Sequence, residues 1–374
     1  MEKLMIVAGE ASGDLYGAGL VRALKKKIPE LKVFGMGGEL MNFSGVEILT
    51  DMKEISVVGI VEVFSHLRKI QNAMKLLTVR LREERPDVLV LIDFPDFNLR
   101  LAKKAKAARI PVIYYISPQV WAWRARRVKK IAKLVDKMLV AYPFEVNIYR
   151  RAGLDTEFVG HPLLDEDFIE LSKEDGMKKY KLNPERPVLA ILPGSRKREI
   201  EVLLPIMIKT LNLLRSKNVQ TIIPVAPSVD FSRVEDIVKG MDVILIRGEV
   251  NDVLSLSDAA IITSGTATLQ AAIKGVPMVI IYKVLPVTYL LGKILVKVKN
   301  IGIVNILAGR EIVPELIQSD VNPKKIAGIL KKMLENSTYS GMMKRDLLEI
   351  KDKLGSPGAS DRAAEEIMKF IEKK

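Results

Sequence analysis

The segment Pro193–Arg198, with the sequence PGSRKR, combines residue types that can bind an anion. It follows an apolar run, Val188–Leu192, and precedes a helical pattern. The first amides of a helix lack partners within the helix, and the helix dipole favours negative charge there. Gly194 would let a phosphate approach the backbone, Ser195 could cap the helix, and Arg196 could hold two oxygens. The pattern predicts a phosphate site, with an ordinary strand-to-helix turn and a solvated basic helix start as the alternative.

A second turn of this kind, Ser264-Gly265-Thr266, follows the apolar run Ala259–Thr263. The helical pattern after it ends at Gly275, as helices often do. Both turns therefore begin helices at the carboxyl ends of predicted strands, and both contain small hydrogen-bonding residues. One ligand with a pyrophosphate group could be held by the two turns together.

Asp93 is the candidate for acid–base chemistry. It follows the apolar run Val88–Ile92, at the strand end where open parallel sheets bind their ligands, and Phe94 and Phe97 flank it. An ordinary aspartate, with a pKa near ~3.9, is a weak base, and apolar surroundings would raise that pKa. The position favours a general base at Asp93, with helix capping as the alternative. For the neighbouring Asp96, capping is the favoured interpretation.

The loop Gly9–Asp14, with the sequence GEASGD, follows the first predicted strand. It is similar to the glycine-rich turn of dinucleotide-binding domains, but its spacing is not GxGxxG and no acidic residue ends the second strand. Two interpretations stay open. The loop is a tight strand-to-helix connection, or it lines a ligand cleft with Glu10, Ser12 and Gly13.

Both tryptophans lie in one basic segment, Ser117–Arg127. Trp123 is followed by Arg124, and such a pair can stack on a sugar or a base, or lie at a lipid headgroup interface. The alternative is a helix whose tryptophans pack inward while its arginines are solvated.

The composition excludes several classes of site. The 374-residue chain has no cysteine, which excludes disulfides, thiolate nucleophiles and cysteine-based zinc sites. Its two histidines, His66 and His161, are too few for a histidine-rich metal centre. The formal net charge of +14 predicts an anionic partner, which could be nucleic acid, a membrane surface or a phosphorylated small molecule. No nucleic-acid-binding motif is visible.

No segment has the pattern of a signal peptide or of a membrane-spanning helix. The apolar run in Met1–Gly9 is too short, and Val276–Val298 is interrupted by lysine, proline and glycine. These patterns predict a cytoplasmic protein. Two stretches, Val57–Phe64 and Val284–Lys299, either meet a membrane surface or belong to the core.

The elements that must position these residues alternate along the chain. Short apolar runs predict six strands before residue 160 and five after residue 185, with helical patterns between most of them. The predicted strands are Lys3–Ala8, Val33–Met36, Val88–Ile92, Val112–Ile116, Met138–Ala141, Thr156–Val159, Val188–Leu192, Thr221–Val225, Val243–Ile246, Ala259–Thr263 and Met278–Tyr282. Such alternation indicates α/β architecture with two doubly wound parallel sheets, and a single barrel is the alternative.

The expected domains are residues 1–164 and 165–355, each large enough for its own core. Residues 356–374 would form a final helix that could pack back on the first domain. The boundary falls in a charged and proline-containing stretch, Gly160–Pro187, which has no sustained strand pattern.

Together the motifs resemble those of the lipid-A-disaccharide synthase family, membrane-associated glycosyltransferases of bacterial lipopolysaccharide assembly. The similar segments follow the family's order and extend over nearly the whole chain. They are Gly9–Asp14, Val58–Val63, Asp93–Asn98, Ser117–Arg127, Gly160–Pro162, Pro193–Arg196, Ser264–Thr268 and Asn305–Glu311. The WAWR and NILAGRE sequences are specific, whereas the glycine-rich turns are common to many sugar-nucleotide enzymes.

The resemblance implies a GT-B fold, in which two Rossmann-like domains face each other across a cleft. It implies that 2,3-diacylglucosamine is transferred, with inversion, from UDP-2,3-diacylglucosamine to the 6-hydroxyl of 2,3-diacylglucosamine 1-phosphate (lipid X). The products would be lipid A disaccharide 1-phosphate and UDP. No metal and no cofactor is implied, because arginine side chains and helix dipoles can stabilise the departing diphosphate.

The resemblance also assigns residues by position. Asp93 would be the base on the acceptor hydroxyl, in the acceptor-binding N-terminal domain, whose part of the cleft would include Glu10, Ser12, Gly13 and Trp123. The diphosphate would be held in the C-terminal domain by Gly194, Ser195, Arg196, Ser264, Gly265 and Thr266, with Asn305 and Arg310 near the nucleotide. Gln270 stands where such enzymes commonly have a glutamate on the ribose, a contact that the glutamine carbonyl can still make.

Acylated substrates imply contact with a membrane, because exposing about a dozen methylenes to water costs on the order of 10 kcal/mol. The expected partner is the anionic inner face of the inner membrane, bound peripherally through Val57–Phe64 and Val284–Lys299. The oligomeric state stays open, with a homodimer as one alternative. Competing functions are another GT-B enzyme, such as a UDP-sugar 2-epimerase or the lipid II-forming transferase, and a nucleic-acid-binding protein.

Overall fold

The computed structural model describes residues 1–56, 63–119, 126–166, 172–214, 218–285, 289 and 300–372. The chain divides into two compact units. Unit 1 consists of Met1–Glu166 together with Leu354–Lys374, and unit 2 of Asp167–Lys353. The carboxyl-terminal segment therefore belongs to the same unit as the amino terminus.

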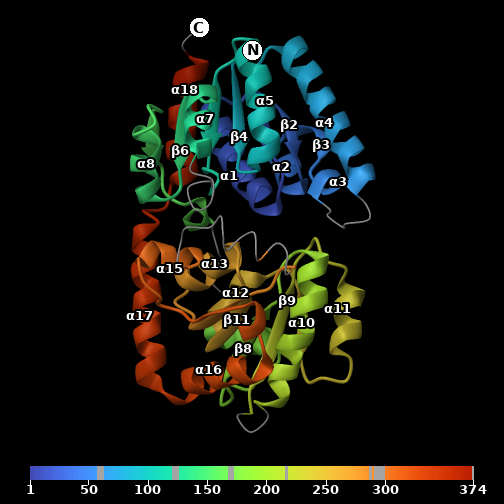
Figure 1. Cartoon of the computed structure of the whole chain (residues 1–374), viewed down its shortest axis with the longest axis vertical. Coiled ribbons are helices and arrows are strands. Elements are labelled where there is room, and N and C mark those ends of the chain that lie inside the picture. The colour runs from blue at the N-terminus through green and yellow to red at the C-terminus, as the bar shows by residue number, and fades with distance from the viewer. Residues whose placement is uncertain are drawn as a thin grey trace. The chain divides into compact units, whose positions relative to one another are not determined.

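Within the described residues, unit 1 has a seven-stranded parallel sheet with the order β3-β2-β1-β4-β5-β6-β7 (Figure 1). Its strands are β1 (Lys3–Ala8), β2 (Lys32–Gly37), β3 (Val46–Asp51), β4 (Val88–Ile92), β5 (Val112–Tyr115), β6 (Lys137–Val140) and β7 (Thr156–Phe158). Its helices are α1 (Ala11–Lys27), α2 (Glu39–Phe43), α3 (Lys53–Ser56), α4 (Val63–Glu84), α5 (Pro95–Ala107), α7 (Arg126–Leu134), α8 (Pro143–Arg150), the 3-10 turn η2 (Pro162–Leu164) and α18 (Ala359–Ile371).

The described part of unit 2 has a six-stranded parallel sheet with the order β10-β9-β8-β11-β12-β13. Its strands are β8 (Val188–Leu192), β9 (Gln220–Val225), β10 (Ile244–Arg247), β11 (Ala259–Thr263), β12 (Met278–Tyr282) and β13 (Glu315–Ile317). Its helices are α9 (Lys173–Lys179), α10 (Lys197–Asn212), α11 (Phe231–Val238), α12 (Val250–Leu256), α13 (Thr266–Ile273), α15 (Ile303–Ala308), the 3-10 turn η4 (Gln318–Asp320), α16 (Pro323–Glu335) and α17 (Ser337–Lys353).

The central strands are short apolar runs because helices bury both faces of each sheet. In unit 1, Leu77 of α4, Leu101 of α5 and Ile131 of α7 join a core with residues of β1, β4 and β5. Figure 1 shows α5 and α7 together in front of these strands. Helices α1 and α18 pack against each other, and α18 also contacts β4. The β4 sequence, VLVLI, is buried along its whole length.

The strand order reverses once in each sheet. In unit 1 the chain builds outward from β1 to β3 and then starts again beside β1 with β4. In unit 2 it builds from β8 to β10 and then starts again beside β8 with β11. Connections leave in opposite directions at these switch points, and this is where open α/β sheets bind ligands.

All eleven predicted strands are present, with ends shifted by one residue at most. The two open sheets contradict the single-barrel alternative. Two strands were not predicted, β3 and β13, and both lie at sheet edges. An edge strand has fewer buried positions, so β3 mixes polar and apolar residues with only two of six buried, and β13 has only three residues, of intermediate burial. Neither forms the apolar run on which the prediction depended.

Aspartates tie each sheet together at the amino-terminal ends of its strands. Asp87 precedes β4 and accepts a hydrogen bond from the amide of Lys3 in β1 (2.8 Å). Asp136 precedes β6 and accepts from Val112 of β5 (2.9 Å). In unit 2, Asp258 precedes β11 and accepts from Val188 of β8 (2.8 Å). Each carboxylate therefore satisfies the first amide of a neighbouring strand.

A fourth carboxylate fixes the carboxyl-terminal helix to unit 1. Asp165 accepts hydrogen bonds from the amides of Gly358, Ala359 and Ser360 (2.7, 2.9 and 2.6 Å), which form the start of α18. Farther along this helix, Glu366 pairs with the largely buried Lys137 of β6 (2.6 Å). Among the described residues, no helix is both long and apolar enough to cross a bilayer.

His161 is a buried histidine at the end of β7. It is only 2% exposed, its Nδ1 accepts a hydrogen bond from the amide of Leu163 (3.2 Å), and the rings of Tyr16 and Tyr142 pack against it. Burial lowers the pKa of His161 to about 3, although the charge of Asp165 acts in the opposite direction. The imidazole is therefore neutral in the folded protein at physiological pH.

This pKa predicts an acid-sensitive fold. In the unfolded chain His161 binds a proton below about pH 6.5, whereas in the folded chain it stays neutral down to about 3. The stabilisation is thus complete above pH 6.5 and is lost as the pH falls toward 3. We expect His161→Asn, whose Oδ1 can replace Nδ1 as an acceptor, to remove this dependence. Between pH 8 and pH 5 the wild type should lose about 2 kcal/mol more unfolding free energy than the variant, measured by urea titration. Parallel pH profiles would contradict this prediction.

Candidate active site

The turn between β8 and α10 surrounds a carboxylate. The backbone amides of Ser195 and Arg196 both donate to Oε2 of Glu199, at 3.0 and 3.2 Å. Gly194 has a φ of +111°, and a Cβ placed on it would lie 2.1 Å from that same oxygen. A side chain at position 194 is therefore excluded on two grounds, and the space it would fill holds an anionic oxygen. In this structure the amides of the turn hold the chain's own carboxylate, and the predicted phosphate site stays a prediction.

The cap of α10 differs from the prediction. Arg196, not Ser195, is the N-cap residue, and Glu199 stands at the third helical position and closes a capping box. The carbonyl of Ser195 instead accepts from the Ser228 hydroxyl (2.8 Å). The Arg196 side chain is 64% exposed, with Nη1 3.8 Å from Glu199 Oε1. Glu199 was missed in the sequence, although a glutamate three residues into a helix is a recognisable capping signal.

The turn between β11 and α13 has the open geometry expected of a ligand-binding turn. Gly265 is the N-cap residue in extended backbone, and among the described residues none other than its chain neighbours has an atom within 4 Å of the position that its Cβ would take. Its carbonyl accepts hydrogen bonds from the amide and the hydroxyl of Thr268 (3.1 and 2.7 Å). In the described part of the chain, the buried hydroxyl of Thr263 has no hydrogen-bond partner. Ser264 and Thr266 are half-buried beside Gly265.

The sheet brings the two turns of unit 2 together. Leu192 at the end of β8 is in register with Ile262 near the end of β11. The segments Gly194–Arg196 and Ser264–Thr266 therefore leave adjacent strands, at the switch point of this sheet. Two helix starts with exposed small residues side by side are the arrangement that a diphosphate would need.

The three predicted nucleotide residues differ in their surroundings. Gln270 lies one helical turn after Thr266, half-buried, and donates to Asn251 Oδ1 of α12 (3.3 Å). Arg310 is exposed and pairs with Asp346 of α17 (2.7 Å), and this hydrogen bond together with the charge of Asp346 raises the pKa of the guanidinium. Both side chains reach the surface and are able to change partners.

Asn305 differs from these two residues because its side-chain amide is fully hydrogen-bonded within unit 2. It is buried, and it donates to the carbonyl of Val313 (2.9 Å) and to Glu315 Oε1 (2.7 Å). Its oxygen accepts from the amides of Ile312 and Val313 (2.7 and 3.1 Å). The side chain therefore fixes the loop that follows α15, which is the loop that contains Arg310.

In unit 1, Asp93 follows β4 at the switch point and is half-buried. Asp93 and Phe94 both have positive φ, +42° and +47°. Left-handed backbone costs a non-glycine residue of order 1–3 kcal/mol, so this turn is strained. Asp96 is exposed and pairs with Arg127 of α7 (2.6 Å), at the start of α5.

The negative charge of Asp93 acts on tyrosines of the core beneath it. Burial, and after it the charge of Asp93, raises the pKa of Tyr114 well above 10. Burial is also the main cause that raises the pKa of Tyr142 and of Tyr149, with Glu145 acting more strongly on both than Asp93 does. These hydroxyls therefore keep their protons, and those of Tyr114 and Tyr149 donate to the carbonyls of Asp93 and Pro118.

The loop Gly9–Asp14 lies next to Asp93, because Ala8 of β1 is in register with Ile92 of β4. A Cβ on Gly9 would lie 2.4 Å from the Phe94 ring, and one on Gly13 would lie 3.1 Å from the Ala8 Cβ. Close packing thus accounts for both glycines. Glu10 is the N-cap residue of α1, and Ser12 is half-buried in the first turn of the helix.

Asp14 has a structural part in this loop. Its buried carboxylate accepts from the amides of Gly38, Leu40 and Met41 (2.7, 3.1 and 3.1 Å) and so fixes the segment after β2. Trp123 lies outside the described residues. The stretches Val57–Phe64 and Val284–Lys299 lie largely outside them as well.

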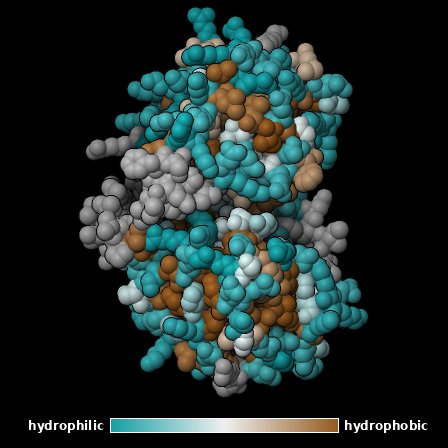
Figure 2. Space-filling view, turned by 90° about the vertical axis from the view of Figure 1, so that its right-hand side faces the viewer, coloured by the Kyte–Doolittle hydropathy of each residue, from teal (hydrophilic) through white to brown (hydrophobic). Residues whose placement is uncertain are grey.

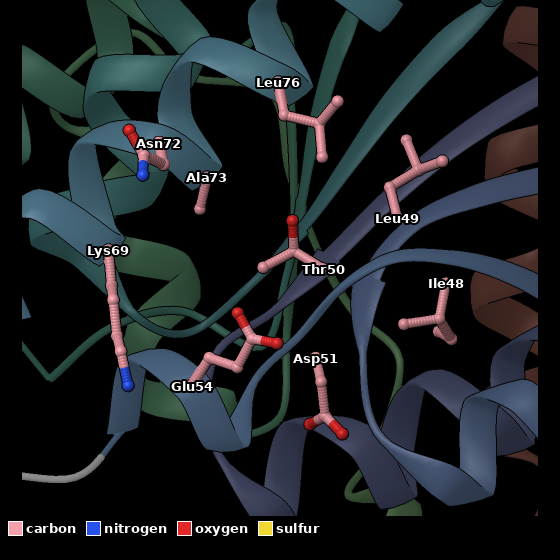
Figure 3. A pocket seen from close by; sticks show the side chains of 9 residues that line it. All are labelled: Ile48, Leu49, Thr50, Asp51, Glu54, Lys69, Asn72, Ala73 and Leu76. Atoms are coloured by element: carbon pink, nitrogen blue, oxygen red, sulfur yellow. The ribbon is translucent and has the colours of Figure 1, made fainter.

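A cavity of about 510 Å³ lies elsewhere in unit 1, between the edge strand β3, α3 and α4 (Figure 3). Figure 3 shows Asp51 and Glu54 on one side of it, with Lys69, Asn72 and Leu76 projecting from α4. It contains none of the predicted site residues. The cavity belongs to the edge of the sheet and not to the switch point.

The family model for lipid-A-disaccharide synthetase matches residues 4–367. The chain belongs to this family. It is 45% identical to the lipid-A-disaccharide synthase of Geobacter sulfurreducens, covering 99% of this chain and 98% of that protein. It is 40% identical to the synthase of Myxococcus xanthus, covering 99% and 97%. It is thus a glycosyltransferase of lipid A biosynthesis with lipid-A-disaccharide synthase activity, and the resemblance of the motifs is confirmed.

Solved structures support the fold. The UDP-GlcNAc 2-epimerase from Neisseria meningitidis bound to UDP-GlcNAc superposes with a TM-score of 0.67 at 15% identity, covering 99% of this chain and 100% of that one. The calicheamicin glycosyltransferase CalG4 gives a TM-score of 0.62 at 14% identity, covering 100% and 99%. At such low identity the likeness concerns architecture alone, and it confirms the GT-B class. Family membership decides between the transferase and the two competing functions, the 2-epimerase and the nucleic-acid-binding protein.

Proposed function

We propose that unit 2 binds the UDP part of UDP-2,3-diacylglucosamine and that unit 1 supplies the base for the acceptor, 2,3-diacylglucosamine 1-phosphate. The observation that supports this most directly is the anion already bound by the turn at Gly194. The amides that hold a carboxylate oxygen of Glu199 are equally suited to a phosphate oxygen. The adjacent turn at Ser264–Thr266 would hold the second phosphate.

In the proposed reaction the carboxylate of Asp93 takes the proton of the acceptor 6-hydroxyl. The acceptor oxygen then attacks the anomeric carbon of the donor sugar from the face opposite to the diphosphate. The bond from that carbon to the diphosphate oxygen breaks, its electron pair leaves with UDP, and the configuration inverts. Arg196 and the two helix starts stabilise the negative charge that develops on the leaving group.

The remaining predicted residues would have supporting roles in substrate binding. Gln270 and Arg310 would contact the nucleotide, because both side chains reach the surface of unit 2. Asn305 would act indirectly, since its amide fixes the loop of Arg310. In the N-terminal unit, Glu10, Ser12 and Gly13 would lie beside the acceptor, together with Trp123.

Glu199 must give up its position when the diphosphate binds. The two cannot share the amides of Ser195 and Arg196, and two anions in one turn would repel each other. We therefore propose that the diphosphate replaces the Glu199 carboxylate. The cost of this exchange is limited because the helix start keeps an anionic partner before and after it.

The first test concerns the base. We expect Asp93→Asn to lower kcat by roughly 10²–10⁴-fold, the usual contribution of a general base, while UDP affinity stays unchanged. Turnover can be measured with UDP-2,3-diacylglucosamine and the 1-phosphate acceptor, and affinity by calorimetry with UDP. Asp96→Asn is a matched control, because Asp96 is exposed and paired with Arg127. Near-normal turnover of Asp93→Asn would remove Asp93 from the mechanism.

The second test concerns the diphosphate site. Arg196→Ala should weaken UDP binding at least about tenfold, the effect of losing a charge-assisted hydrogen bond. The control is Arg198→Ala, at a residue that is also exposed, and it should change UDP binding less than about twofold.

Glu199→Gln should tighten UDP binding several-fold, because a neutral acceptor competes less well for the amides. Glu201→Gln, on the same helix, controls for the change in net charge. Equal effects within each pair would show that only the overall charge matters.

We also propose that the protein acts on the cytoplasmic face of the inner membrane, bound peripherally. The net charge of +14 supports attraction to anionic lipid. Figure 2 shows apolar atoms on the face of unit 1 that carries α4, where Leu76 and Val79 are each 41% exposed. Arg68 and Lys69 belong to the same helix, which follows the predicted docking stretch Val57–Phe64. A basic helix with exposed apolar residues is suited to the membrane interface.

The membrane proposal predicts a specific loss of binding. Leu76→Ser combined with Val79→Ser should lower partitioning onto vesicles of phosphatidylglycerol and phosphatidylcholine by at least about tenfold, because two apolar side chains no longer enter the interface. Met342→Ser with Leu348→Ser, two exposed residues of α17, is the control. Sedimentation with sucrose-loaded vesicles measures both. If the α4 variant and the α17 variant bind alike, α4 does not dock.

A further inference from the structure

The peptide between Asp93 and Phe94 is held in a conformation that it would not adopt alone. Both residues are in the left-handed region, which non-glycine residues avoid. Ile116, at the end of the neighbouring strand β5, also has a positive φ of +62°, and its carbonyl accepts from the amide of Asp93 (3.4 Å). A turn with such strained backbone persists only where contacts with the surrounding structure hold it in place.

Two side chains hold this turn through a single atom, the carbonyl oxygen of Asp93. Nδ2 of Asn98 donates to it at 2.8 Å and also donates to the carbonyl of Ile92 at 3.1 Å. The hydroxyl of Tyr114 donates to the same Asp93 oxygen. A carbonyl oxygen has two lone pairs, so this one is saturated. The orientation of the Asp93–Phe94 peptide, and with it the backbone from which the Asp93 side chain projects, is thereby fixed.

Tyr114 is placed to do this from inside the protein. It lies on β5 beside β4, with Tyr114 in register with Leu91, and its side chain is fully buried in the core of unit 1. Water cannot replace its hydrogen bond there. Tyr115 is the next residue and is equally buried, but its side chain points to the opposite face of the sheet, where Ser360 of α18 lies.

We propose that Tyr114 is a positioning residue for the catalytic Asp93, acting with Asn98 through the Asp93 carbonyl. This inference rests on the proposed role of Asp93 as the base. Tyr114 touches neither substrate, so its loss does not remove a binding contact. Its loss frees the strained peptide to relax and moves the carboxylate away from the acceptor hydroxyl. Small displacements of a catalytic group lower the rate of the chemical step strongly.

The test compares two equal substitutions on adjacent residues. Tyr114→Phe should lower kcat about tenfold and leave KM for both substrates within twofold. Tyr115→Phe, which removes a hydroxyl equally deep in the same strand, should keep kcat within twofold. Thermal unfolding and UDP titration of both variants check that each is folded and binds the nucleotide. Asn98→Ala, which removes the other donor to the same carbonyl, provides a second variant with the same expected loss of kcat.

The decisive measurement places Tyr114→Phe in the Asp93→Asn background. If Tyr114 acts through the Asp93 carboxylate, the double variant should turn over as fast as Asp93→Asn alone, within twofold. A further tenfold loss in that background would show another role and overturn the inference. So would equal kcat values for Tyr114→Phe and Tyr115→Phe. Wild-type turnover by Asp93→Asn would instead remove the proposed base, and so the two failures are distinguishable.

Discussion

Hydrogen bonds from backbone amides to carboxylates organise this protein. Wherever a strand begins or a helix starts after a reversal, amides lack partners in the regular structure. Asp87, Asp136 and Asp258 satisfy the first amides of neighbouring strands. Asp165 holds three amides at the start of α18, and Asp14 holds three more after β2. Each bond to a charged group contributes roughly 1.5–3 kcal/mol, so these contacts fix the sheets and the loops around the switch points.

Glu199 belongs to this group of carboxylates, yet its position sets it apart. Asp14 and Asp165 accept hydrogen bonds from amides of segments that belong to unit 1. Asp14 is buried, and Asp165 is half-buried. Glu199 binds the amides of Ser195 and Arg196 at an exposed turn, on the side of the sheet where the strand order reverses. In the proposed function this cap is reversible, because the amides of Ser195 and Arg196 would exchange the Glu199 carboxylate for a phosphate oxygen of the substrate.

The architecture and much of the candidate site followed from apolar runs and from the residues after them. The runs located β4, β8 and β11, and the rule that ligands gather at strand ends then selected Asp93 and the turns at Gly194 and Ser264. The edge strands β3 and β13 were not predicted because their residues are only partly buried and form no apolar run. The roles of Glu199 and Tyr114 were missed for another reason. Glu199 has the sequence signal of a capping box, but that signal gives no indication that its carboxylate occupies the predicted phosphate turn. Tyr114 has no such signal, because its partner is a backbone carbonyl 21 residues away in the sequence.

The two switch points bear strain in different ways, and the difference agrees with their proposed parts. In unit 2 the positive φ falls on Gly194, which adopts it without strain, as suits a turn that is proposed to exchange one anion for another. In unit 1 it falls on Asp93 and Phe94, where it costs free energy and must be maintained by Asn98 and Tyr114. A turn that exchanges one bound anion for another benefits from a backbone that can change conformation without strain. A base that must meet one hydroxyl benefits from being held, and the core of unit 1 provides the tyrosine that holds it.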